Sequence, residues 1–266
     1  MNEPNYAVID RAIIPDLVEL AEEHDVKNWC LFPAPVEDEF ARVAPYLVLL
    51  TPELSEHLSA QEKPWGFMFI SDAGNKILIP HLRRLLSVYI DENDAPTFCR
   101  FYDPRVLWSM MDSLTPAQQY FLAGPMRVIQ TEYPEQRQMS FDALSVMHQA
   151  PEHLTLNSEQ YSYILAQSYQ YLEDDISQFV YHHQAHNAKN EATAQVFAKQ
   201  LLKQLSEWGI SVASEVKSVA RCCVDNRIDN LASLPQPWVT LLSNQCHPAA
   251  YRVKTLLKTS GGINGL

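Results

Sequence analysis

Apolar residues change their spacing part way along this chain, and the change limits the folds open to it. Up to about residue 130, short apolar runs alternate with turns that contain proline. From about residue 157 onward, apolar residues recur over long stretches at helical spacing. Short runs of branched and aromatic residues are typical of buried strands, and recurrence every three or four residues indicates an amphipathic helix. Two patterns in separate blocks predict two lobes of different architecture.

We predict a first lobe over residues 1–130, a joint over residues 131–156 and a second lobe over residues 157–266. The first lobe is expected to be α/β or α+β, with a short-stranded sheet and flanking helices. The second is expected to be all-helical, with an irregular C-terminal tail. Pro134 and Pro151 interrupt any periodic pattern in the joint. The spacing leaves open whether the sheet is parallel or mixed.

Start signals and short apolar runs predict the elements of the first lobe. Asp103 followed by Pro104 predicts a helix start, because aspartate caps the first turn and proline suits its first position. Thr115 and Gln118 have the spacing of a capping box at the start of another helix. The runs expected to form strands are Tyr6–Ile9, Trp29–Phe32, Pro45–Leu50, Trp65–Ile70, Val88–Ile90 and Thr97–Tyr102.

A third helix of the first lobe is expected after Ser71 or Asp72, either of which offers a cap. Pro80 falls inside this stretch and favours a later start, since proline disrupts a helix interior. The apolar stripe of this helix is predicted to be Ile77, Leu78, Leu82, Leu85 and Leu86.

The second lobe is predicted to begin with a long helix capped by Asn157 or Ser158, and Gly209 is expected to end the next helix. Trp238 follows a proline in an irregular segment, so it is either an exposed anchor or packed on its own lobe. The inner faces of three successive helices are expected to include Ile164, Leu165, Leu172, Ile176 and Val180, then Val196, Phe197, Leu201, Leu202 and Leu205, then Val212, Val216, Val219 and Cys223.

The charge balance excludes several classes of partner. The chain carries 20 basic and 32 acidic residues, a net of −12. We therefore expect no binding of nucleic acid or of an anionic membrane surface, because both require a basic face. No apolar run approaches the length of about 20 residues that a membrane span needs. The five cysteines are scattered and no secretory signal is visible at the N-terminus, so reduced thiols and a cytoplasmic location are expected.

Catalytic motifs are missing from the sequence. It contains no glycine-rich phosphate loop, no nucleophile elbow and no common zinc motif. We therefore expect no enzyme activity, no cofactor and no bound metal. The one alternative site is His182-His183-x-x-His186, where His182 and His186 lie one helical turn apart. A third ligand would come from His148, His153 or Asp174. We favour a solvated helix end over this metal site.

The densest polar segment is Arg100-Phe101-Tyr102-Asp103-Pro104-Arg105. An exposed pair of guanidinium groups at a strand–helix junction is suited to holding a carboxylate on a partner. The other interpretation is that Arg100 or Arg105 ties the junction to an internal carboxylate such as Asp10 or Asp72. We favour the internal pairing, since capping alone explains Asp103.

Several segments together resemble the adaptor (chaperone) domain of bacterial type VI secretion, over about residues 6–126. These segments are Tyr6–Asp10, Pro45–Val48, Pro64–Phe67, His81–Leu86, Arg100–Arg105 and Leu114–Pro125. The resemblance implies a non-catalytic adaptor that binds a toxic effector protein and promotes its loading onto the VgrG spike protein. It also implies structural or partner-binding roles for Asp10, Trp65, Arg100, Tyr102, Asp103, Pro104 and Arg105.

Charge patterning suits two different partners. Residues 1–142 carry a net charge of −11 and residues 143–266 a net of −1. Residues 230–266 contain Arg252, Lys254 and Lys258 with no acid, which predicts a small basic end for an acidic partner surface. Two alternatives to the adaptor remain: an immunity or regulatory protein that caps a toxin, and a metal-dependent enzyme that uses His182 and His186.

Overall fold

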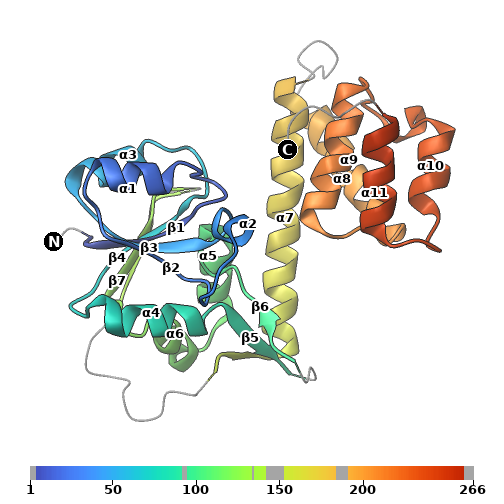
Figure 1. Cartoon of the computed structure of the whole chain (residues 1–266). Coiled ribbons are helices and arrows are strands. Elements are labelled where there is room, and N and C mark those ends of the chain that lie inside the picture. Colours follow the sequence, from blue (N-terminus) through green and yellow to red (C-terminus); the bar gives the residue numbers. More distant parts are fainter. Residues whose placement is uncertain (1–3, 92–94, 134, 142–152, 184–190, 261–266) are drawn as a thin grey trace. The chain divides into compact units, whose positions relative to one another are not determined.

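The computed structural model describes residues 4–91, 95–133, 135–141, 153–183 and 191–260. The chain divides into two compact units, Met1–Ser168 and Tyr169–Leu266. The division falls inside the long helix α7 (Ser158–His183), drawn in yellow in Figure 1.

Among the described residues, six strands of the first unit form one sheet in the order β2-β3-β1-β4-β7-β8. Every neighbouring pair in it is antiparallel, so the first unit has the α+β form of the predicted fold class. In the central strand, Val8 lies opposite Leu47 on one side and Phe67 on the other. The strands are β1 (Tyr6–Asp10), β2 (Asn28–Cys30), β3 (Pro45–Leu49), β4 (Gly66–Ile70), β7 (Val128–Thr131) and β8 (Arg137–Ser140).

Helices cover both faces of this sheet (Figure 1). Successive residues of a strand face opposite sides, so Tyr6 and Val8 enter one apolar cluster while Ala7 and Ile9 enter another. This is why β1 is apolar at consecutive positions rather than at alternate ones. The first cluster includes residues of α4 (Asn75–Arg84), α5 (Pro104–Ser113) and α6 (Pro116–Ala123), and the second includes residues of α1 (Leu17–Glu23) and α3 (Pro52–Ser59). The short helix α2 (Asp38–Ala41) precedes β3.

A smaller sheet lies beside the start of α7. Its central strand β5 (Ser87–Ile90) pairs antiparallel with β6 (Thr97–Phe98) and parallel with β9 (Thr155–Leu156). Asn157 and Gln160 form a reciprocal cap at the first turn of α7. The amide of Gln160 is buried and donates to the carbonyl of Ser113 at 3.0 Å, which fixes this turn to the first unit.

The second unit consists of helices within its described residues. They are the later turns of α7, then α8 (Glu191–Glu207), α9 (Ala213–Asp225), the 3-10 turn η1 (Leu231–Ser233), α10 (Gln236–Ser243) and α11 (Ala249–Thr259). Gly209 ends α8 with a φ of 72°, and the amide of Ile210 returns to the carbonyl of Leu205 at 2.8 Å. Among the described helices, none combines the length and the apolar character needed to cross a membrane.

The predicted fold class is confirmed, as are the helix caps at Asp103, Thr115, Asn157 and Gly209. The interval 131–156, predicted as a joint, contains strands β8 and β9 of the first unit.

Some predicted details are wrong. The cap of α4 is Gly74, because the Ser71 hydroxyl instead donates to the carbonyl of Pro125 at 2.7 Å. The helix also runs through Pro80 rather than starting after it. The strand predicted over Thr97–Tyr102 ends at Phe98, since the chain turns where the amide of Asp103 reaches the carbonyl of Arg100.

Four apolar side chains assigned to inner faces are exposed. Three of them lie next to a buried stripe residue, about 100° around the helix from it, and so outside the narrow face that meets the core, whereas Val212 precedes the first turn of α9. The four are Ile77, Leu165, Val196 and Val212. Trp238 is partly buried and packs on the core of the second unit, which is the packed alternative.

Candidate functional site

Two segments far apart in the sequence meet at one end of the main sheet. Asp10 ends β1 and Arg100 follows β6, and their side chains form an ion pair with 2.7 Å between Oδ2 and Nη2. The Asp10 side chain is 1% exposed, whereas 51% of the Arg100 side chain is exposed. Of the two interpretations of Arg100, the structure shows the internal pairing.

The carboxylate of Asp10 is fixed from several sides. Its Oδ1 accepts from the amide of Ala12 at 2.9 Å, and its own amide donates to the carbonyl of Trp65 at 2.7 Å. Burial raises the pKa of Asp10, and the neighbouring Arg100 opposes that rise. A buried carboxylate without a cation is costly, so Arg100 offsets the desolvation of Asp10. Trp65 is buried and contributes to this end of the sheet through its backbone.

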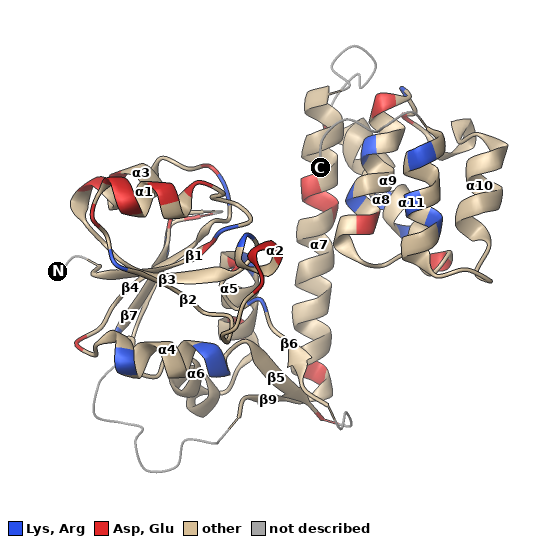
Figure 2. Ribbon diagram, in the orientation of Figure 1, with Lys and Arg blue, Asp and Glu red and all other residues tan. Residues whose placement is uncertain are grey.

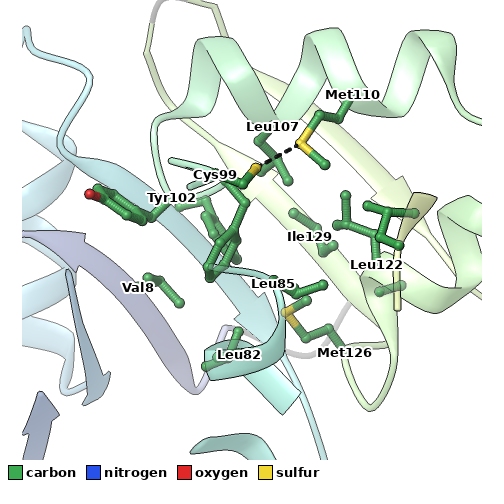
Figure 3. Packing of buried hydrophobic residues seen from close by; sticks show 14 of the residues in the cluster. Val8, Leu82, Leu85, Cys99, Tyr102, Leu107, Met110, Leu122, Met126 and Ile129 are labelled. Carbon is green, nitrogen blue, oxygen red and sulfur yellow. Dashed lines mark hydrogen bonds between the residues drawn. The ribbon is translucent and has the colours of Figure 1, made fainter. Parts of the chain in front are cut away.

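Cys99 and Tyr102, on either side of Arg100 in the chain, face inward. Figure 3 shows Cys99 and Tyr102 in the apolar cluster, with the thiol of Cys99 directed at the sulfur of Met110, 3.5 Å away. Burial raises the pKa of both the Cys99 thiol and the Tyr102 hydroxyl to about 12. The guanidinium of Arg100 lies 5.4 Å from the centre of the Tyr102 ring, so the ring supports it from one side.

Asp103 and Arg105 form a second ion pair at the start of α5. Oδ1 of Asp103 accepts from the backbone amide of Arg105 at 3.0 Å, which is the helix cap. The guanidinium of Arg105 also binds both carboxylate oxygens, at 3.0 Å from Nε and 2.8 Å from Nη2. Pro104 occupies the first turn. These two side chains are mostly buried and their contacts hold the junction in one conformation.

The predicted motif residues are therefore close together, although they come from distant segments. Asp10, Arg100 and Tyr102 share contacts, Asp103 and Arg105 follow directly in the chain, and Trp65 joins through its carbonyl. The other carboxylate considered for the internal pairing, Asp72, lies apart and pairs with Arg127 at 3.0 Å.

The sequence pattern did not single out the aromatic pair beside Arg100. Phe98 is 56% exposed, and its ring meets that of the half-buried Phe32 edge to face, with 6.1 Å between centroids. The available signal was the two-residue spacing of Phe98 and Arg100 in the strand predicted over Thr97–Tyr102, which places both on one face. In the structure both are exposed, and Cys99 between them is buried.

The histidine cluster is only partly described. His186 and the candidate ligand His148 lie outside the described residues. His182 and His183 are exposed near the end of α7, and Nδ1 of His183 lies 2.9 Å from the carbonyl of Phe179. The described residues include no group of three histidine, cysteine, aspartate or glutamate side chains placed to hold a metal.

The charges of the two units differ strongly. The first unit, residues 1–168, has 11 basic and 24 acidic residues, a net of −13. The second unit, residues 169–266, has 9 and 8, a net of +1. Acidic residues mark α1, α2 and α3 in Figure 2, and basic residues mark α8, α9 and α11.

The predicted basic end is smaller than the sequence indicated. Arg252 is 3% exposed, and its Nη1 donates to the carbonyl of Trp208 at 2.8 Å and to that of Leu242. The cation of Arg252 lies at the C-terminal ends of α8 and α10, where the helix dipoles are negative and the last carbonyls have no partner within the helix. Lys254 and Lys258 remain at the surface.

Comparison with known proteins adds one match. The model of a family described as "Domain of unknown function (DUF4123)" matches residues 5–120, somewhat less than half of the chain. The matched region runs from β1 into α6 and contains all the motif residues named above. No curated protein matches, and no solved structure matches.

Proposed function

We propose that this chain is a non-catalytic adaptor that binds a toxic effector in the cytoplasm of the producing cell and promotes its loading onto the VgrG spike of a type VI secretion system. The family match over residues 5–120 carries the proposal, because it covers nearly the same stretch as the resemblance to the adaptor domain. The close grouping of Asp10, Arg100 and Tyr102 supports it, since the motif segments of the resemblance build one part of the fold.

The proposed mechanism is stoichiometric binding. The adaptor covers apolar segments of the effector until loading, and no bond is made or broken. The contrast between a net of −13 in one unit and +1 in the other favours different partners for the two units. Such complementarity sets partner choice and encounter rate more than affinity.

Co-purification tests the proposal. The full chain, carrying an affinity tag, is expressed with the proteins encoded beside its gene, among which the proposal expects an effector and a spike protein. We expect it to retain the effector, and to form a larger complex when the spike is added, by size-exclusion chromatography. Deletion of its gene is expected to abolish export of that effector. Retention of neither protein contradicts the adaptor function. Protection of a sensitive host from the toxin, with export unchanged, indicates an immunity protein instead.

A further inference from the structure

Phe98 and Arg100 project from the same side of an extended segment of the first unit. The amide of Cys99, between them, donates to the carbonyl of Leu86 at 2.9 Å, so the backbone continues the pairing with β5. Cys99 is buried, whereas Phe98 and Arg100 are exposed. Residues two apart in an extended chain share one face, so the ring and the guanidinium are neighbours at the surface.

The guanidinium of Arg100 is bound on one side by a buried carboxylate and is exposed to solvent on the other. Its Nη2 binds the buried carboxylate of Asp10, and its plane lies near the ring of Tyr102. Among the described residues, Nε and Nη1 of Arg100 donate no hydrogen bond. Each edge of a guanidinium pairs one N–H of Nη2 with an N–H of Nε or of Nη1, so the edge that Asp10 does not occupy keeps two donors on this fixed, half-exposed side chain, and a carboxylate binds such an edge with two parallel hydrogen bonds. Fixing the side chain in advance reduces the entropy lost on binding.

An apolar surface adjoins this edge. The ring of Phe98 is more than half exposed and contacts the half-buried ring of Phe32. Exposed aromatic residues beside an arginine are the composition enriched at the energetic centre of protein interfaces. We call Phe32, Phe98 and Arg100 the Phe–Arg surface.

The chemistry of the Phe–Arg surface selects its occupant. Asp10 already neutralises much of the Arg100 charge, so the surface suits one singly charged carboxylate better than a phosphate group, which favours several cations or a helix N-terminus. A single carboxylate also meets less repulsion from the net charge of −13 on this unit than a polyanion such as nucleic acid does. We infer that the Phe–Arg surface binds a segment of a partner protein in which an acidic side chain lies next to an aromatic or aliphatic one. This inference rests on the proposed function, which supplies the effector and the spike as the partners to test.

The experiment compares two surface variants with two matched controls in the full chain. Arg100→Lys keeps a cation for Asp10 but removes the planar edge, and Phe98→Ser removes the exposed ring. Arg84→Lys makes the same arginine-to-lysine change, and Ile77→Ser likewise replaces an exposed apolar side chain by serine, at other exposed positions of the first unit. Calorimetric titration with the effector and with the spike protein, separately, gives the dissociation constants. We expect each surface variant to weaken binding of one partner by about tenfold or more, and each control to change it less than about twofold.

Folding is checked by circular dichroism and thermal melting of each variant. If Arg100→Lys disturbs the pair with Asp10 and thereby the fold, the test rests on the binding of Phe98→Ser alone. Phe98 is more than half exposed, so its replacement is expected to leave the fold intact. In the partner that loses affinity, acidic residues are then replaced by their amides. We expect one such change to weaken binding to the wild-type chain but not to Arg100→Lys, which is the signature of a direct pair.

The possible failures are distinguishable. If the wild-type chain binds neither partner, the proposed function falls and this inference falls with it. If the wild-type chain binds and both surface variants bind equally well, the inference alone is wrong. Equal losses in the surface variants and in their matched controls also overturn it, since the effect then has no connection to the Phe–Arg surface.

Discussion

Acidification is expected to destabilise the first unit through His81. This residue lies in α4 and is 5% exposed, with Nε2 3.0 Å from the carbonyl of Leu122. A carbonyl only accepts, so Nε2 carries the proton of the neutral ring. Burial lowers the pKa of His81 from 6.5 to about 4, with a smaller lowering from the cation of Arg84 and an opposing effect of the Leu122 bond.

The sign and size follow from proton linkage. Between these two pKa values the unfolded chain binds a proton at His81 and the folded chain does not, so stability is full above about pH 6.5 and falls as the pH approaches 4. The shift corresponds to about 3 kcal/mol in total, of which about 2 kcal/mol is lost between pH 7.5 and pH 5.

Urea unfolding at these two pH values measures the effect. Trp208 and Trp238 are changed to phenylalanine, so that the tryptophan fluorescence reports only on the first unit. His81→Gln in the same background does not titrate, and it is the comparison that removes the contributions of all other groups. We expect the wild-type residue to lose about 2 kcal/mol more than the glutamine variant between about pH 7.5 and pH 5. An equal loss in both proteins would refute the assignment to His81.

Three further changes test the packing. Gly124→Ala is expected to cost about 2 kcal/mol or more by urea unfolding, because the new Cβ would lie 2.3 Å from Cε1 of His81 at a residue with a φ of +50°. Asp103→Ala removes the helix cap and the pair with Arg105, so we expect it to lower the free energy of unfolding of the first unit by about 1–2 kcal/mol, measured as a lower melting temperature. Asp103→Asn is expected to lower it by less. A full loss with asparagine would contradict the capping role. Arg252→Leu removes the donor from the carbonyls of Trp208 and Leu242, so we expect about 1–3 kcal/mol less stability in the second unit, with faster hydrogen exchange there and no change in the first.

Local signals in the sequence predicted elements where a few neighbouring residues decide the structure. Asp103 with Pro104, and Thr115 with Gln118, begin helices because their side chains satisfy amides within the same turn. Strand β7 escaped prediction because its stability depends on pairing with β4, which lies almost 60 residues earlier in the chain, and β8 depends in turn on pairing with β7. Most residues assigned to the inner faces of helices are buried, but a shift of one residue along a helix is enough to turn Ile77 or Val196 outward.

The candidate site could be predicted in part for the same reason. The residue types in Arg100–Arg105 indicated ion pairs, and the buried partner of Arg100 was among the carboxylates considered. The exposed ring of Phe98 was not recognised as part of a surface. Its exposure depends on where β6 ends and on the side from which Phe32 approaches, and both are tertiary facts.

The position of β7 has a practical consequence for anyone who expresses a fragment. A piece cut at residue 120 stops before the end of α6 and omits the strand that hydrogen-bonds to Met68, Phe69 and Ile70. The open edge of β4 would then be apolar and free to pair with another molecule, and exposed apolar edges of this kind promote aggregation. A boundary beyond residue 168 retains β7, β8 and β9 together with the first turn of α7.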